Sequence, residues 1–308
     1  MNSHQGIRLG TRASALARWQ AEWVAARLRD LGLEVVMVPI TTSGDQHQER
    51  PIGALPTRGV FTKELERALL DDRIDLAVHS VKDLPTDPVP GLCLAAIPQR
   101  ASVADILVSP RYPSLEALPP RAVVGTGSLR RRAQLLHVRP DLVMKDVRGN
   151  VDTRLRKLDG GDFDALVLAE AGLRRLELAD RITQVMPPSV LLSAVGQGAL
   201  GLETRDAGPA RELVRVLNHP ESEAAVLAER EMLSALQGGC LAPIAAWGRI
   251  EDGQLALTGR VLSPDGGKRI EARLAADASQ AVELGRRVAE ALLAQGAEEL
   301  VRMARQGP

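Results

Sequence analysis

The stretch that decides the fold reads Val123-Val124-Gly125-Thr126-Gly127-Ser128-Leu129-Arg130-Arg131-Arg132. Its valines predict a short apolar strand, its glycines and hydroxyl residues a turn, and residues 129–136 a helix. Such a turn presents backbone N–H groups at the helix N-terminus, where the helix dipole favours an anion. Because that dipole disfavours cations, three arginines in a first turn need an anion nearby. The stretch therefore predicts an anion site in preference to a solvated basic face.

Predicted strands alternate with predicted helices around this stretch, which is typical of an α/β fold with a largely parallel sheet. The strands fall at residues 7–11, 35–40, 76–79, 92–97, 123–124 and 165–168, and the helices at 15–31, 62–70 and 151–158. Residues 195–203 form a glycine-spaced piece that we expect to be extended. From residue 221 the pattern changes to a helix, three antiparallel strands with Asp-Gly turns, and a closing helix over 279–305. This last part predicts a small α+β domain.

Composition limits the possible partners. Lys plus Arg and Asp plus Glu both number 39 among 308 residues, so the formal net charge is zero. A neutral chain with 2% aromatic residues is a poor candidate for coating nucleic acid. No apolar run approaches membrane-spanning length. We therefore expect a small-molecule partner, no nucleic acid and no membrane, and any basic site must be local.

The cysteines and histidines indicate a reducing compartment and no metal. Cys93 and Cys240 lie far apart in unlike settings, so we expect no disulfide framework and a cytoplasmic location. Residues 1–6 are polar and lack a signal-peptide core. The five histidines show no metal-ligand spacing.

Polar side chains follow several predicted strands, where ligands bind in open α/β sheets. They are Arg12, Ser14, Lys82, Asp83, Thr126, Ser128, Arg130, Arg131, Arg148, Asn150, Arg174 and Arg175. Guanidinium groups suit bidentate binding of carboxylates, so the set predicts a cleft that holds several carboxylates or phosphates. Asn150 is expected to cap the helix that carries Arg154.

Two single residues stand out for chemistry. Asp83 lies among cations, which favour its ionised form, and could stabilise a cationic intermediate; it could equally be a turn residue that binds local N–H groups. Cys240 lies in a loop bounded by glycines and Pro243, so it is a better nucleophile or attachment point than Cys93. No histidine adjoins Cys240, which disfavours a papain-like site.

Six ordered motifs connect these residues to a known family. They are His79-Ser80-Val81-Lys82-Asp83-Leu84-Pro85, Val124-Gly125-Thr126-Gly127-Ser128-Leu129-Arg130-Arg131, Arg148-Gly149-Asn150-Val151-Asp152-Thr153-Arg154, Ala171-Gly172-Leu173, Val195-Gly196-Gln197-Gly198-Ala199 and Gly238-Gly239-Cys240. From about residue 7 to the last helix, the chain closely resembles the porphobilinogen deaminase, or hydroxymethylbilane synthase, family.

The resemblance implies a transferase of haem and porphyrin biosynthesis. Four porphobilinogen molecules are joined with loss of ammonia into the linear tetrapyrrole hydroxymethylbilane. Family members carry a dipyrromethane cofactor bound by a thioether to a cysteine that matches Cys240. The growing chain carries many carboxylates, which agrees with a local arginine-rich site in a neutral protein.

The resemblance also implies a role for individual residues. Asp83 matches the catalytic carboxylate, which stabilises the azafulvene cation formed as ammonia leaves, and Arg12 is a candidate for moving the proton. Carboxylates of the cofactor and chain should be held by Lys82, Thr126, Ser128, Arg130, Arg131, Arg148 and Arg154, while Asp83 should bind the cofactor by accepting hydrogen bonds from its pyrrole N–H groups. Substrate contacts match Arg12, Ser14, Gln20, Arg148, Arg154, Arg175 and Gln197. Residues 41–59 resemble a mobile active-site loop, with Phe61 just beyond it.

The implied fold has three domains in a monomer. The first two resemble the lobes of a periplasmic-type binding protein, and the chain crosses between them twice. The expected bounds are residues 1–98 with 196–218, residues 99–195, and residues 219–308. Gly127 departs from the family, which often has serine there, and Arg58 replaces a common lysine.

Two other functions remain open from the residues alone. A two-lobed solute-binding module for carboxylates would explain the arginines, but it leaves Asp83 and Cys240 without a role. A phosphate-ligand enzyme would use the turn at residues 125–131 and would carry no covalent pigment.

Overall fold

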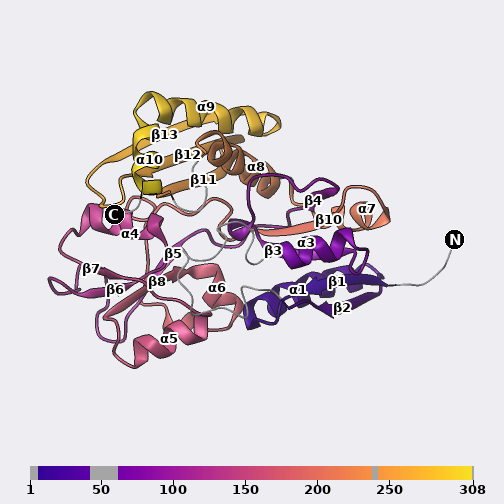
Figure 1. Ribbon diagram of the computed structural model, residues 1–308, viewed down its shortest axis with the longest axis horizontal. Coiled ribbons are helices and arrows are strands. Elements are labelled where there is room, and N and C mark those ends of the chain that lie inside the picture. The colour runs from indigo at the N-terminus through magenta and orange to yellow at the C-terminus, as the bar shows by residue number, and fades with distance from the viewer. Residues whose placement is uncertain (1–5, 42–61, 238–241, 307–308) are drawn as a thin grey trace. The chain divides into compact units, whose positions relative to one another are not determined.

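The computed structural model describes residues 6–41, 62–237 and 242–306 (Figure 1). The chain divides into two compact units, each described by itself below. Unit 1 comprises residues 1–100 and 199–223, and unit 2 comprises residues 101–198 and 224–308. The chain therefore passes between the units three times.

Unit 1 contains a five-stranded sheet of order β2-β1-β3-β10-β4. Its strands are β1 (Ile7–Thr11), β2 (Val35–Pro39), β3 (Leu76–Ser80), β4 (Leu92–Ala96) and β10 (Leu200–Arg205). Strand β1 pairs in parallel with β2 and β3, while β10 runs antiparallel between β3 and β4. The strand added last in sequence thus lies inside the sheet.

Three helices accompany this sheet: α1 (Ala15–Asp30), α3 (Lys63–Leu70) and α7 (Pro209–Arg215). Ser14 caps α1, because its side chain accepts a hydrogen bond from the Ala17 backbone N–H. Residues of α1 such as Val24 and Leu28 are fully buried and pack with β1, β3 and β10 in one apolar cluster. Burying that apolar face holds α1 on the sheet.

The first part of unit 2 contains a five-stranded sheet with the same pattern of strand directions. Its sheet runs β7-β6-β8-β5-β9, and β5 is antiparallel to both of its neighbours. Its strands are β5 (Asp105–Val108), β6 (Val123–Gly125), β7 (Val143–Lys145), β8 (Ala165–Ala169) and β9 (Gln184–Val185), and its helices are α4 (Leu129–Val138), α5 (Val151–Asp159) and α6 (Glu170–Arg175). The predicted α/β class is confirmed.

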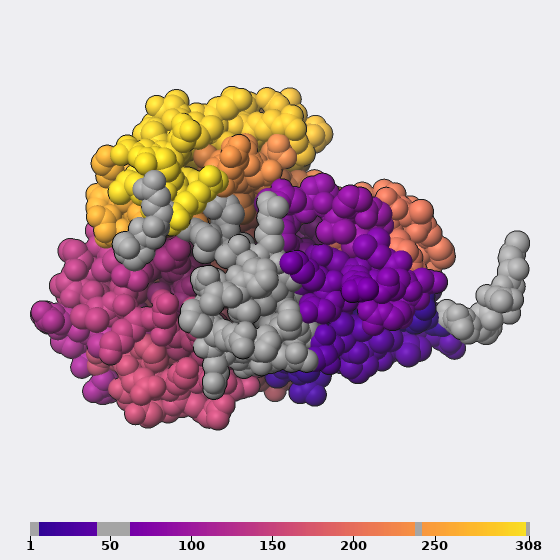
Figure 2. Space-filling view, in the orientation of Figure 1, coloured from indigo at the N-terminus to yellow at the C-terminus, as the bar shows by residue number. Residues whose placement is uncertain are grey.

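The rest of unit 2 is an antiparallel sheet of order β11-β12-β13 with α9 (Ala281–Ala294), α10 (Ala297–Gln306) and most of α8 (Pro220–Ala235), whose first four residues belong to unit 1. The strands are β11 (Ile244–Glu251), β12 (Gln254–Leu262) and β13 (Arg269–Ala276). Leu257 of β12 packs with Met232 of α8 and Val288 of α9 in one buried cluster. Yellow atoms of the C-terminal helices form the surface of this part in Figure 2.

Strand β12 is buried along nearly its whole length because its two faces have different neighbours. Leu255, Leu257 and Val261 face the helical cluster. Arg260, on the other face, donates a hydrogen bond to Gln134 of α4. This strand therefore joins the third sheet to the second.

Three local predictions were wrong. Residues 195–198 form a turn instead of an extended piece, and strand β10 begins only at Leu200. Gly198 has a φ of +85°, and a Cβ there would lie 2.5 Å from the Ala101 carbonyl oxygen, so the turn requires glycine. The closing helix is two helices, interrupted by Gly296 at a φ of +95°. Asn150 precedes α5, but its side chain makes no capping bond.

The predicted three-domain bounds stay a prediction. The third sheet and its helices have an apolar cluster of their own, which supports the third domain, although by contacts they belong to unit 2.

Asp75 joins two parts of unit 1 through a network with Arg8 and Arg205. Arg8 donates from its backbone N–H and its Nε to one carboxylate oxygen at 3.0 and 2.9 Å, and Arg205 donates to the other at 2.8 Å. Burial raises the pKa of Asp75, but these hydrogen bonds outweigh burial and lower the pKa to about 2.

The variant Asp75→Asn should change the acid dependence of stability. The carboxyl has a lower pKa when folded than its usual 3.8, so it stabilises the fold above pH ~4 and loses that contribution as the pH falls to ~2. In urea unfolding followed by circular dichroism, we expect the unaltered chain to lose more stability over this window than Asp75→Asn. The exposed Asp30→Asn should behave like the unaltered chain. Equal losses in all three proteins would contradict the role of Asp75.

Candidate functional site

The turn between β6 and α4 has the predicted form. Thr126 is buried, and its hydroxyl accepts a hydrogen bond from the Ser128 backbone N–H at 3.2 Å. Ser128 in turn caps α4 by accepting from the Arg131 backbone N–H. Side chains of the turn thus satisfy two of the N–H groups that an anion could have used.

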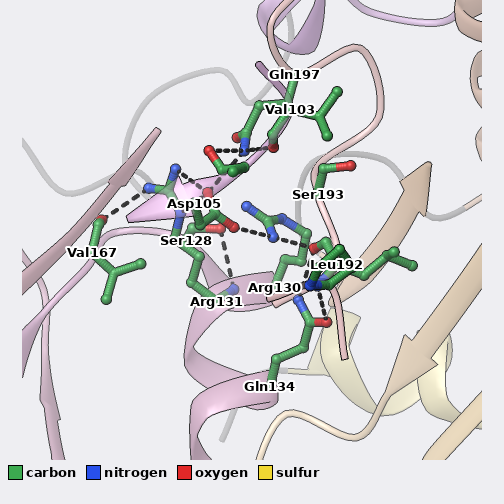
Figure 3. Close-up of polar contacts among 12 residues, drawn as sticks. Val103, Asp105, Ser128, Arg130, Arg131, Gln134, Val167, Leu192, Ser193 and Gln197 are labelled. Carbon is green, nitrogen blue, oxygen red and sulfur yellow. Dashed lines mark hydrogen bonds and ion pairs between the residues drawn. The ribbon is translucent and has the colours of Figure 1, made fainter. Parts of the chain in front are cut away.

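Arg130 and Arg131 of α4 do not face solvent. They are buried, with 4% and 6% of their surface exposed. Arg130 Nη1 lies 2.7 Å from one oxygen of Asp105, and Arg131 Nη2 lies 2.8 Å from the other. Arg131 also donates to the Val167 carbonyl, and Arg130 to the Leu192 carbonyl (Figure 3). The anion that the sequence required near the arginines is supplied in part by the chain itself.

Asp105 is the partner of these arginines that the sequence analysis missed. It opens β5 and is fully buried. Burial raises the pKa of this carboxyl, but the charges of Arg130 and then Arg131 outweigh burial, so the pKa lies well below its usual value. Gln197 donates to Asp105 at 2.8 Å and to the Val103 carbonyl at 2.7 Å. In the sequence, the one available sign of this pairing was a single acidic residue at the start of an apolar strand.

The cluster of Arg130, Arg131 and Asp105 carries a surplus positive charge, since one carboxylate faces two guanidinium groups. Arg130 Nε is buried and has no hydrogen-bond partner among the described residues. Burial, together with the charge of Arg131, lowers the pKa of Arg130 against the opposing effect of Asp105. An additional anion would offset both the surplus charge and the unsatisfied donor, so these residues fit a carboxylate-bearing group.

Other predicted residues lie at neighbouring positions of unit 2. Arg148 is half-buried before α5, and Arg154 donates to the Gly149 carbonyl at 2.8 Å. Arg175, at the end of α6, donates to the Gly198 carbonyl at 2.8 Å. Burial lowers the pKa of Arg175 to about 10, which is the direction expected for a cation in a poorly solvated place.

Unit 1 gathers its predicted residues at the carboxyl ends of β1 and β3. Because these strands are parallel neighbours, their ends share one edge of the sheet. Gln20, which is buried on α1, donates to the Ser80 hydroxyl at 2.8 Å and so joins that helix to the end of β3. Lys82 and Asp83 follow on a short 3-10 turn and are exposed. Arg12 is half-buried, and Ser14 serves as the cap of α1.

Cys240, Phe61 and the loop from residue 42 to 59 lie outside the described residues. Glu229 of α8, which was not predicted, is fully buried and accepts from the backbone N–H groups of Gly196 and Gly248, both at 2.7 Å. It therefore holds the turn at residues 195–198 against β11. That turn carries Gln197, the donor to Asp105.

No group of three or more His, Cys, Asp or Glu side chains in the described ranges could hold a metal ion. No helix within those ranges is both long and apolar enough to span a membrane.

Two family models match the chain. Residues 7–212 match "Porphobilinogen deaminase, dipyromethane cofactor binding domain", and residues 224–294 match "Porphobilinogen deaminase, C-terminal domain". Porphobilinogen deaminase of Syntrophotalea carbinolica is 49% identical over 97% of this chain and 96% of its own length. That of Pelotomaculum thermopropionicum is 48% identical over 97% of each chain.

A solved structure is also similar. A nutrient-binding protein from Burkholderia cenocepacia bound to methionine aligns with 14% identity and a TM-score of 0.44, covering 75% of this chain and 96% of that one.

Replacing Asp105 should destabilise the fold strongly. In Asp105→Asn two buried guanidinium groups lose their counter-charge, and we expect the free energy of unfolding to fall by about 3–5 kcal/mol. The surface pair of Arg139 and Asp141 offers a matched control, because Asp141→Asn should cost far less stability than Asp105→Asn. Urea unfolding measures both. Small losses of unfolding free energy, similar in Asp105→Asn and Asp141→Asn, would show that Asp105 does not stabilise the buried arginines.

Proposed function

The chain belongs to the porphobilinogen deaminase family, and from this premise we propose which of its residues carry out the family's reaction. The enzyme is a transferase of tetrapyrrole and haem biosynthesis that joins four porphobilinogen molecules, with loss of ammonia, into hydroxymethylbilane. Its cofactor is dipyrromethane. When bound, this group supplies the two-ring primer to which substrate units are added.

The arginine cluster is the observation that carries the proposal. Each porphobilinogen brings two carboxylates, and the surplus charge around Arg130 and Arg131 fits such groups. We assign binding of the cofactor and chain carboxylates to Lys82, Thr126, Ser128, Arg130, Arg131, Arg148 and Arg154, and binding of the cofactor's pyrrole N–H groups to Asp83. We assign attachment of the dipyrromethane cofactor to Cys240, through a thioether bond.

The strand ends of unit 1 supply the groups nearest the chemistry. Asp83 is exposed after β3, so its carboxylate is available to stabilise the positive charge that develops on the substrate as ammonia leaves. Arg12 would hold or move a proton in the same step. Ser14, Gln20, Arg148, Arg154, Arg175 and Gln197 would orient the substrate together with Arg12. The hydrogen bond from Gln20 to Ser80 supports this by fixing α1 to the end of β3.

The remaining proposals concern the state of the protein in the cell. We propose a monomer in the cytoplasm, with porphobilinogen as its small-molecule partner. The separation of the two cysteines along the chain supports a reducing compartment.

Intact mass of freshly purified protein tests the proposed function directly. The unaltered chain should be heavier than its sequence by two deaminated porphobilinogen units, while Cys240→Ser should have the mass of its sequence. Cys93→Ser is the matched control and should retain the added mass. An unaltered chain that stays unmodified after incubation with porphobilinogen would contradict both the cofactor and the reaction.

The variant Asp83→Asn should separate chemistry from binding of the primer. We expect turnover to fall by at least about 100-fold, because the charge that stabilises the developing cation is removed, while the added mass remains. Asp87→Asn, an exposed carboxylate on the same connection, should keep near-normal turnover. The rate of turnover is measured from the absorbance of the product after the product has been oxidised. Normal turnover in Asp83→Asn would remove that residue from its assigned role.

A further inference from the structure

Gln134 lies one helical turn after Arg130 on α4, so the two side chains share a face of the helix. It is buried, with 1% of its surface exposed. Its amide makes a reciprocal pair of hydrogen bonds with the backbone of Leu192: Nε2 donates to the carbonyl at 3.1 Å, and Oε1 accepts from the N–H at 2.9 Å (Figure 3). The amide therefore binds both the carbonyl and the N–H of Leu192.

The Leu192 carbonyl is also an acceptor for Arg130, whose Nη1 lies 2.5 Å away. Arg130 is thus held between two acceptors, Asp105 and this carbonyl. The next residue, Ser193, bonds to β11 through its hydroxyl and its carbonyl, both with Ala246. The segment that positions Arg130 is consequently anchored by Gln134 on one side and by β11 on the other.

A third contact ties Gln134 to the third sheet. Arg260 of β12 donates from Nη1 to Gln134 Oε1 at 2.7 Å, from Nε to Glu271 at 2.6 Å, and from Nη2 to the Pro188 carbonyl at 3.1 Å. Arg260 is buried like Arg130. Oε1 of Gln134 therefore accepts two hydrogen bonds, while Nε2 donates one.

The hydrogen-bond partners around position 134 favour an amide side chain there. A glutamate would still accept from Leu192 and Arg260, but its charge would cancel the surplus that suits a bound carboxylate. An apolar side chain would leave the Leu192 peptide and Arg260 without their partner. A neutral group that both donates and accepts satisfies all three contacts and leaves the positive charge unchanged.

We propose that Gln134 is a positioning residue of this enzyme: it holds the Leu192 carbonyl and thereby fixes Arg130 for carboxylate binding, and Arg260 links it to the third sheet. The inference rests on the proposed role of Arg130. Gln134 itself touches neither substrate nor cofactor.

The test compares Gln134→Met with Ser193→Ala, which removes a buried hydrogen bond from the same segment but contacts no arginine. Both should lower the midpoint of thermal unfolding, Gln134→Met by more because it breaks three contacts and Ser193→Ala only one. Gln134→Met alone should lower the fraction of purified protein that carries the two-ring group, measured by intact mass. It should also raise the KM for porphobilinogen about tenfold, with a smaller change in kcat.

Full occupancy and an unchanged KM in Gln134→Met, beside a lowered unfolding midpoint, would show a purely structural role and overturn the proposal. If Gln134→Met does not fold, Gln134→Glu takes its place, because it keeps two of the three contacts; it should also lose occupancy, and normal occupancy would overturn the proposal.

Arg130→Leu separates this inference from the function on which it rests. Normal occupancy and normal KM in Arg130→Leu would contradict the carboxylate role of Arg130, and the inference about Gln134 with it. A loss in Arg130→Leu without a loss in Gln134→Met would overturn the positioning role alone.

Discussion

The carboxylate of Asp105, buried between two guanidinium groups, is the interaction on which the second sheet depends. Two arginines can leave water only if an anion accompanies them, because an uncompensated buried charge costs several kcal/mol. Asp105 meets this need from the first position of β5 and joins that strand to α4. Gln197 adds a third link, from the turn at residues 195–198, which Glu229 in turn holds against β11. Strand, helix, turn and third sheet thus converge on one carboxylate.

The carboxylate role proposed for this cluster is compatible with a chain of zero net charge. One anion neutralises only one of the two arginines, so the buried cluster keeps a positive charge that water does not screen well. The surplus is local, which suits the proposed binding of a growing pyrrole chain. In the proposed arrangement, Gln134 holds the Leu192 carbonyl, which accepts from Arg130, through a neutral amide that leaves the charge balance unchanged.

Much of the architecture could be predicted because its signals are local. The alternation of residues 254–261 and the Asp252-Gly253 turn indicated an antiparallel hairpin, and the structure has it as β11 and β12. The errors came where tertiary contacts override local pattern. Gly198 reads as part of an extended piece, yet the approach of the Ala101 carbonyl makes it a turn residue. Asn150 has the chemistry of a cap, but its side chain does not make that bond.

The sequence by itself determined the α/β alternation, the strand–turn–helix at residues 123–132, the need for an anion beside Arg130 and Arg131, and, through six ordered motifs, the family and its reaction. Only the tertiary structure decided which anion the chain itself provides. Asp105 precedes these arginines by 25 and 26 residues, and Gln134 meets Leu192 across 58. The pairing of buried charges depends on which strands become neighbours and on which side chains are excluded from water. Neither can be deduced from the spacing of residues along the chain.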